Sequence, residues 1–110
     1  MFQRVAANVE QYMNVLSARQ KLVVSNIANV DTPNFKTKDL DFRAELNAAV
    51  TGSPSSVLEV SNLPSKNDGN NVNLDRESRM LAENAMRFNL ATSLAREEIK
   101  NIRSAIQDGK

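Results

Sequence analysis

The chain is divided by the stretch Val23–Phe42, VVSNIANVDTPNFKTKDLDF. A long helical pattern precedes this stretch, and a connector followed by a second helical pattern comes after it. Thr32 precedes Pro33, and a residue before proline is displaced from the α region of backbone space. The first helix is therefore predicted to end between Asn29 and Asp31, in a turn that small polar side chains can support.

Residues 1–31 carry one apolar stripe and contain neither glycine nor proline. Its members recur at steps of three, four or seven residues, which is the spacing of one helix face; they are Val5, Val9, Tyr12, Leu16, Val23, Ile27 and Val30. Arg19 and Gln20 stand where the stripe would continue. They could form a polar break in the packed seam, but we favour the interpretation that they mark the edge of the solvated face.

Residues 32–73 have a different character, because all three prolines and two of the three glycines lie there. Within this connector, residues 39–50 can form a short amphipathic helix, and residues 57–60 can form a short strand. Connectors of this length are usually functional or disordered. We therefore expect residues 32–73 to be partly disordered in the monomer.

Residues 74–110 show the most regular periodicity of the chain. Apolar and small residues alternate in steps of four and three, namely Leu74, Ser78, Leu81, Ala85, Phe88, Thr92, Ala95, Ile99, Ile102 and Ile106. This a/d heptad pattern predicts a long helix with coiled-coil packing. Asn73 or Asp75 can cap its start, and Glu83 and Arg87 are spaced for an ion pair.

The sequence thus predicts one all-α domain. Two long terminal helices pack as a coiled-coil hairpin, and a largely irregular connector with a short helix and a short strand joins them. A pair of helices buries one stripe from each and little else, and small domains with little core often depend on oligomerisation. Apolar residues outside the stripes would stay exposed, which indicates a subunit of a larger assembly.

The residue inventory argues against an enzyme. The 110 residues include no histidine and no cysteine, the usual general base, thiol nucleophile and zinc ligands. We interpret the carboxylates Asp39, Asp41 and Glu45 as capping and solvating groups. We predict no catalytic, cofactor or metal site and no small-molecule substrate. The net charge of +1 without a basic block gives no reason to expect nucleic-acid binding.

Two runs of the sequence resemble signatures of the bacterial flagellar rod and hook proteins. The first is NIANVDTPNFK at residues 26–36, followed by DLDF at 39–42. The second is DGNNVNLDRE at residues 68–77, continued by LAENAMRF at 81–88. The residues that match these motifs are Asn26, Asn29, Asp31, Pro33, Asp68, Gly69, Asn70, Asn71 and Asn84. Asn34 stands where the family has glycine, but asparagine tolerates the left-handed conformation well enough for the turn to survive.

The resemblance, together with DLDF, implies a structural subunit of the proximal rod of the flagellar basal body, which transmits torque for motility. It implies that the terminal helices pack against other copies, against FlgC and other rod proteins, and against the adaptor FliE. It also implies export to the periplasmic rod through the flagellar type III apparatus, without a cleaved signal peptide.

We expect the assembly interface to comprise Val5, Val9, Tyr12, Leu16, Val23, Ile27, Val30, Phe35, Leu81, Ala85, Phe88, Ala95, Ile99, Ile102 and Ile106. The heptads alone would also permit a free helical coiled-coil adaptor or a chaperone-like binding module.

Overall fold

The computed structural model describes residues 2–51 and 57–108, and their side chains except those of 2–6 and 49–50. Its elements are helix α1 (Phe2–Ala28), strand β1 (Lys38–Asp39), helix α2 (Phe42–Thr51), strand β2 (Leu58–Glu59) and helix α3 (Leu74–Asp108). The prediction of a helical hairpin with long terminal helices is confirmed, and the connector carries a short two-stranded sheet.

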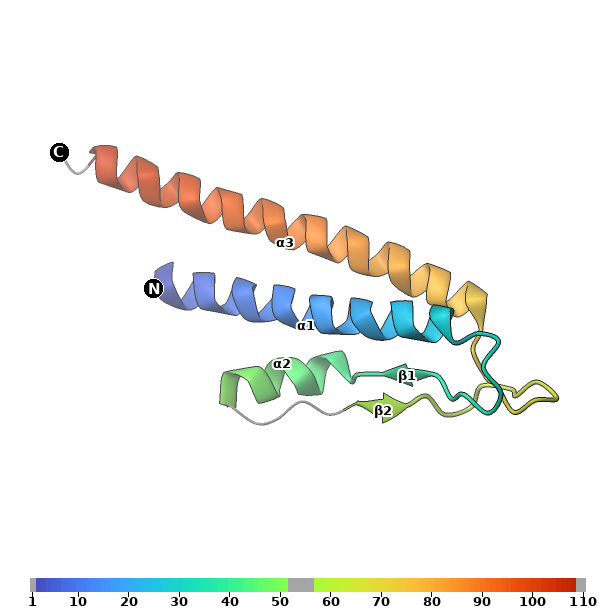
Figure 1. The fold of residues 1–110 in the computed structure, drawn as a ribbon. Helices are drawn as coiled ribbons and strands as arrows, with labels where there is room; N and C mark the ends of the chain where they lie inside the picture. Colours follow the sequence, from blue (N-terminus) through green and yellow to red (C-terminus); the bar gives the residue numbers. More distant parts are fainter. Residues whose placement is uncertain (1, 52–56, 109–110) are drawn as a thin grey trace.

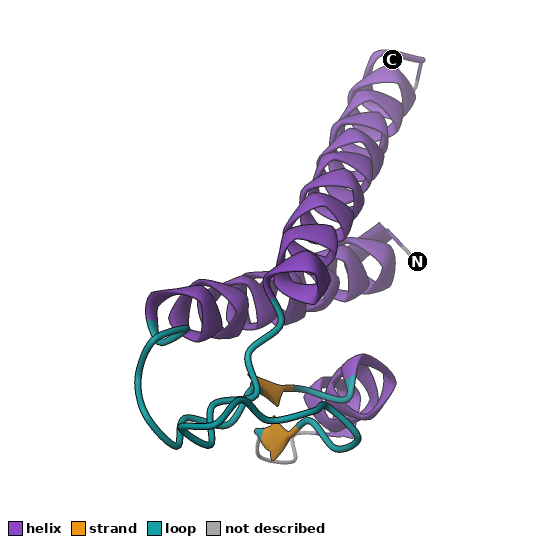
Figure 2. Ribbon diagram, turned by 90° about the vertical axis from the view of Figure 1, so that its right-hand side faces the viewer, coloured by secondary structure: helices purple, strands orange, loops and turns teal. Residues whose placement is uncertain are grey.

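Helix α1 lies between α3 and a smaller layer formed by α2 and the two strands (Figure 1). Because α1 and α3 run antiparallel, the start of α1 and the end of α3 lie at one end of the molecule, and the loops that follow α1 and precede α3 gather at the other (Figures 1 and 2). The molecule measures 69 × 27 × 18 Å, and its radius of gyration is 18.1 Å. A compact chain of this length would have a radius of gyration of about 13 Å, so much helix surface is uncovered.

Helix α1 buries its apolar stripe where α3 and the small layer meet it. Leu16 and Val23 are buried, and the Tyr12 and Phe42 rings meet edge-on at 5.3 Å between α1 and α2. The helix ends at Ala28, where the Asn29 side chain donates a 2.8 Å hydrogen bond to the Ser25 carbonyl. Helix α1 therefore ends one residue before the predicted range of Asn29 to Asp31.

Local side chains also fix where α2 and α3 begin. The Asp41 carboxylate accepts a 3.2 Å hydrogen bond from the Ala44 amide at the start of α2. The Asn73 side chain accepts one of 3.1 Å from the Arg76 amide at the start of α3, so of the two predicted candidates, Asn73 and Asp75, it is Asn73 that caps the helix. Strand β1 pairs antiparallel with β2, which lies within the strand predicted at residues 57–60.

The seam of α3 that faces α1 is displaced by one residue from the predicted seam. Its buried residues are Glu77, Asn84 and Ala91, which are spaced seven apart. Four of the ten predicted seam residues lie beside them and are half-buried, namely Leu81, Thr92, Ala95 and Ile102. The other six are exposed, namely Leu74, Ser78, Ala85, Phe88, Ile99 and Ile106. The prediction followed apolar periodicity, whereas the structure buries two polar residues whose hydrogen-bond partners lie on or beside α1.

The favoured interpretation of Arg19 and Gln20 was wrong, because both belong to the packed seam. Arg19 forms a two-pronged ion pair with Asp39, at 3.0 and 3.1 Å. Gln20 accepts a 3.1 Å hydrogen bond from the Asn84 side chain of α3. Polar residues at seam positions commonly fix the register of a helix pair, and these two link α1 to β1 and to α3.

Candidate assembly site: a polar junction and two helix flanks

The two sequence motifs, far apart in the chain, meet at the loop end of the hairpin. The Asn34 amide donates a 2.9 Å hydrogen bond to the Asp68 carbonyl, and the Asn71 amide donates one of 3.2 Å to the Phe35 carbonyl. The two runs are therefore one structural unit, which we call the polar junction (residues 26–38 and 66–77).

Asn70 is the central residue of the polar junction. Its side chain is 0% exposed and donates 2.8 Å hydrogen bonds to the carbonyls of both Asn29 and Thr32. Its side-chain oxygen accepts a 2.8 Å bond from the Val72 amide. One asparagine thus satisfies three backbone groups of the turn after α1 and the approach to α3.

Asn71 and Asn26 likewise bond backbone groups, at the start of β1 and just before it. The Thr37 amide donates a 2.6 Å bond to the Asn71 side chain. Asn26, at the end of α1, bonds both the amide and the carbonyl of Lys38, at 3.1 and 2.8 Å, and also donates to the Glu77 carboxylate. Asparagine suits this position because its amide both donates and accepts.

The junction also depends on two residues with left-handed backbone. Asn34 has a φ of 64° and Gly69 a φ of 85°, so the turn does survive with asparagine in place of the usual glycine. A Cβ atom on Gly69 would lie 2.3 Å from the Asn34 side-chain oxygen. Glycine is therefore required at position 69 both for its conformation and for the close approach of Asn34.

Gly69→Ala is expected to destabilise the protein by about 1–3 kcal/mol, through backbone strain together with this clash. The check is urea denaturation followed by circular dichroism, in the wild-type background and in an Asn34→Gly background. Asn34→Gly removes the clashing side chain but leaves the φ of residue 69 unchanged, so the loss should be smaller there. Equal losses in both backgrounds would show that the contact with Asn34 contributes nothing.

A charged cluster joins the polar junction to the helix seam. Arg76 contacts the carboxylates of Asp39 at 2.8 Å and Glu77 at 2.7 Å, and Arg19 contacts Asp39 from α1. Glu77 is fully buried, and the other three side chains are at most 19% exposed. Two positive and two negative groups thus neutralise one another where α1, β1 and α3 meet.

The pKa of Asp39 is lowered from its ordinary value. Burial alone would raise this pKa, but the hydrogen bonds from Arg19 and from the Leu40 amide, the charge of Arg19 and the bond from Arg76 outweigh burial. Asp39 is therefore a charged partner of two arginines, and its predicted role as a capping or solvating group was wrong. Asp41 does cap α2, as expected.

The contacts of the polar junction hold two segments of the chain together. Among residues 2–51 and 57–108, no three histidine, cysteine or acidic side chains gather closely enough to hold a metal ion. No helix of the described chain is long and apolar enough to cross a membrane. The polar contacts of the junction connect parts of this chain to one another, which rigidifies the end of α1 and the start of α3.

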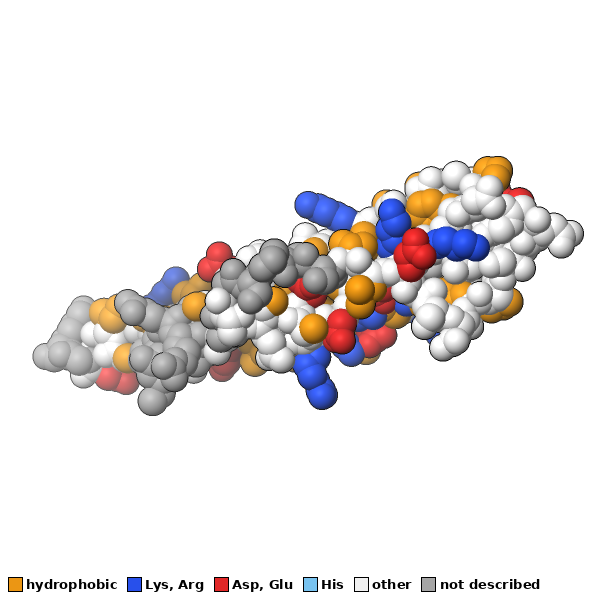
Figure 3. All heavy atoms as spheres, turned by 90° about the horizontal axis from the view of Figure 1, so that it is seen from below, with side chains coloured by type: hydrophobic (Ala, Val, Ile, Leu, Met, Phe, Trp, Pro, Cys, Tyr) orange, Lys and Arg blue, Asp and Glu red, His pale blue; other side chains and the backbone are white. Residues whose placement is uncertain are grey.

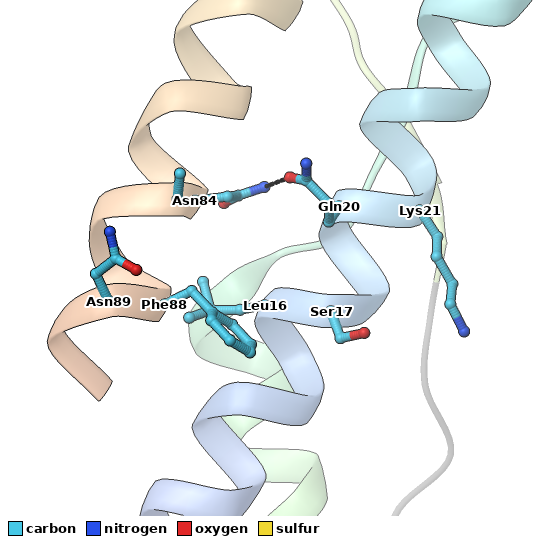
Figure 4. Close-up of a pocket in the computed structure, with 8 residues that line it drawn as sticks. Leu16, Ser17, Gln20, Lys21, Asn84, Phe88 and Asn89 are labelled. Atoms are coloured by element: carbon cyan, nitrogen blue, oxygen red, sulfur yellow. Dashed lines mark hydrogen bonds between the residues drawn. The ribbon is translucent and has the colours of Figure 1, made fainter. Parts of the chain in front are cut away.

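Beyond the junction, grooves run along both sides of the α1–α3 seam. On one side, a groove of about 370 Å³ is lined by Leu16, Ser17, Gln20, Lys21, Asn84, Ala85, Phe88 and Asn89. Figure 4 shows Gln20 and Asn84 pointing toward each other from the two helices, with Phe88 and Leu16 beside them. A second groove of about 330 Å³ borders Met13, Ile99 and Ile102 further along α3. The opposite side carries a groove of about 250 Å³ bordered by Tyr12, Leu90 and Leu94.

The residues predicted for the assembly interface fall into three groups. Leu16 and Val23 are buried within the subunit. The half-buried group comprises Val9, Tyr12, Ile27, Val30, Phe35, Leu81, Ala95 and Ile102, and the exposed group comprises Ala85, Phe88, Ile99 and Ile106. Val5 lies in α1, but its side chain is outside the described part of the structure. Only the last two groups leave surface for a partner.

Of the matched motif residues, Asn26, Asn70, Asn71 and Asn84 are buried, Asn29 and Gly69 half-buried, and Asp31, Pro33 and Asp68 exposed. Sequence reasoning missed the cluster of Arg19, Asp39, Arg76 and Glu77. The signal that could have found it is a charged residue at a seam position, as at Arg19.

The surface seen from the side of α2 shows basic and acidic side chains among apolar ones (Figure 3).

Comparison with known proteins supports the resemblance that these motifs indicate. A family model described as flagella basal body rod protein matches residues 13–36, which contain the second half of α1 and the turn after it. The chain is 36% identical to the flagellar basal body rod protein FlgB of Borrelia hermsii, over 88% of this chain and 91% of that protein. This chain belongs to the FlgB family of flagellar basal body rod proteins.

More distant FlgB proteins match over a similar length. The FlgB proteins of Yersinia enterocolitica and Escherichia coli are 28% and 27% identical to this chain, each over 91% of both sequences. The match therefore includes both long helices and the connector. Membership in the FlgB family makes this chain a structural rod subunit of the flagellar basal body.

Proposed function

We propose that this chain forms part of the proximal rod, where it transmits torque and assembles through α1 and α3 with copies of itself, with FlgC and other rod proteins, and with the adaptor FliE. The observation that carries the proposal is the apolar surface that α3 leaves exposed. Leu74, Met86, Phe88, Leu90, Leu94, Ile99 and Ile106 are all exposed in the single chain. Exposed apolar surface beyond what is usual for a monomer is typical of interaction sites.

The solvent-accessible surface area of the single chain also supports assembly with partners. It exposes 7769 Å², whereas a compact monomer of its mass of 12.2 kDa would expose about 6,100 Å². A standard protein–protein interface buries about 800 Å² on each partner. The surplus is therefore of the size that two such contacts would cover.

Deletion of the gene tests the proposal. We expect cells without it to lack basal bodies with a rod and to lose swimming, and we expect the wild-type gene to restore both. Intact basal bodies in the deletion strain would contradict a rod function and would favour the alternative of a free adaptor or chaperone-like module.

Export is a separate part of the proposal. We propose that the chain reaches the periplasmic rod through the flagellar type III apparatus without cleavage. Mass spectrometry of the chain from isolated basal bodies and from cytoplasm should give the same mass. A shorter chain in the basal body would contradict this part alone.

Ile99→Asp is expected to block rod assembly while leaving the isolated subunit folded. Ile99 is 56% exposed in the single chain, so a charge there costs the monomer little, but a charge buried unpaired in an interface costs several kcal/mol. The measurements are basal-body counts in cells and thermal unfolding of the purified chain. Ser25→Asp, which adds the same charge at an exposed position of α1 outside the predicted interface, is the control and should assemble. Normal basal bodies with Ile99→Asp would exclude this residue from the interface.

A further inference from the structure

Helix α3 carries two unpartnered apolar surfaces on opposite flanks. The first, which we call the groove face, consists of Ala85, Phe88, Ile99 and Ile102 together with Met13 and Ser17 of α1, and the two larger grooves run along it. The second, which we call the ridge, consists of Met86, Leu90 and Leu94. These three are spaced four residues apart and are 72%, 59% and 54% exposed.

The two surfaces differ in shape. The groove face is hollowed, with volumes of about 370 and 330 Å³, and small side chains such as Ala85 line it. The ridge is formed by long side chains that stand on one line of the helix. A projecting line of side chains packs into a groove between helices, as ridges fit grooves in ordinary helix packing.

Charged residues of both signs border the two surfaces. Arg96 and Arg103 follow Thr92 and Ile99 in alternating steps of four and three, so they extend the line of the groove face. Glu83 and Glu97 lie seven residues before and after Leu90, and Arg79 lies seven residues before Met86, so these three share the line of the ridge. Glu83 is paired with Arg87 of its own chain at 2.6 Å. The groove of about 330 Å³ is also lined by two acidic residues, Glu10 of α1 and Glu98 of α3. Both lie closer to the contact between α1 and α3 than Arg96 does.

We propose that the ridge of one copy packs into the groove face of the next copy, so that successive α3 helices lie side by side. This proposal rests on the proposed rod function and specifies the contact between copies. The contact is heterologous, because each copy offers a different surface to each of its two neighbours. A heterologous contact whose rotation does not close generates an open helical array, which is the architecture that a rod requires.

Cysteine cross-linking tests this contact, because the natural chain contains no cysteine. Cells would express Leu90→Cys together with one groove-face variant, either Ala85→Cys, Phe88→Cys or Ile99→Cys, and basal bodies would be isolated and oxidised. We expect a disulfide-linked heterodimer for at least one pair, at several-fold higher yield than for the control pair of Leu90→Cys and Ser25→Cys. Ser25 is exposed on α1, half a helical turn from the Leu16 line.

A chain that carries both cysteines of the reactive pair extends the test. Each copy would then link to two neighbours, so oxidation should give a ladder of dimers, trimers and longer species. Leu90→Cys expressed alone should give no dimer. A dimer from Leu90→Cys alone would show a symmetric contact and would overturn the proposal.

The experiment separates failure of this contact from failure of the rod function. Each variant is first scored for swimming; where Leu90→Cys prevents assembly, Met86→Cys or Leu94→Cys takes its place on the ridge. Basal bodies that contain the variants but yield no ridge-to-groove link at any of the three groove positions would overturn the contact and leave the rod function standing. Basal bodies that never contain the chain would overturn both.

Discussion

Asn70→Ala is expected to destabilise the protein by about 3 kcal/mol, because it leaves one buried amide unsatisfied, at a cost of about 1–3 kcal/mol, and removes two further hydrogen bonds worth about 1 kcal/mol each. The amide of Val72 would lose its partner. The carbonyls of Asn29 and Thr32 would each lose one of two hydrogen bonds and keep the one from a backbone amide. The loss is greater than that of a surface asparagine because Asn70 is fully buried. The measurement is urea denaturation followed by circular dichroism at neutral pH.

Asn67→Ala is the matched control for Asn70→Ala. Asn67 lies in the same loop but is exposed, and surface substitutions usually change stability by less than about 0.5 kcal/mol. A loss with Asn70→Ala no larger than that of the control would mean that water or a local rearrangement satisfies the Val72 amide. Because the junction connects the end of α1 to the start of α3, we also expect Asn70→Ala to lower the number of assembled basal bodies.

The ends of the elements could be predicted from sequence because local chemistry decides them. Pro33 and the small polar residues before it end the first helix, and Asn73 starts the last one. The pairing of Glu83 with Arg87 likewise needs only helix geometry, and it occurs at 2.6 Å. Each of these features depends on residues within a few positions of one another.

The face of α3 that packs against α1 could not be predicted in the same way. Apolar periodicity assigns Ile99 and Ile106 to the seam, but both are exposed, while Glu77 and Asn84 are buried. Burial of Glu77 becomes favourable only because Asn26 and Arg76 bond its carboxylate. One of these partners lies 51 residues away in the sequence, and spacing along one helix carries no information about it.

The residues of the candidate site could likewise be predicted from sequence, but the contacts between distant residues could not. The resemblance identified the asparagines of the motifs, but it did not show that Asn70 bonds the carbonyl of Asn29, 41 residues earlier, or that Asn71 bonds the amide of Thr37, 34 residues earlier. The displaced seam has a consequence for assembly, because the apolar line that α1 does not use remains open to a partner. The interface residues of α3 therefore stay a prediction, now restricted to those that the hairpin leaves exposed or half-buried.

Asp39→Asn is expected to cost about 3 kcal/mol at neutral pH, because removal of one member of a buried ion pair leaves an uncompensated charge. Arg19 and Arg76 would then face each other across a neutral amide, with side chains only 14% and 19% exposed. Asp41→Asn is the control, since asparagine caps a helix about as well as aspartate does. We expect the control to unfold within about 0.5 kcal/mol of the wild type.

The pH dependence of this loss identifies its electrostatic origin. The pKa of Asp39 is lower in the folded protein than its ordinary value, so the folded state binds the proton less readily than the unfolded state does. The stabilisation by the Asp39 charge is therefore fully present above the unfolded pKa of about 3.9 and is lost as the pH falls through the folded pKa. The difference in unfolding free energy between wild type and Asp39→Asn should stay constant from pH 7 to about pH 5 and shrink below about pH 4. A difference that does not change with pH would show that Asp39 holds the two arginines by the shape of its hydrogen bonds and not by its charge.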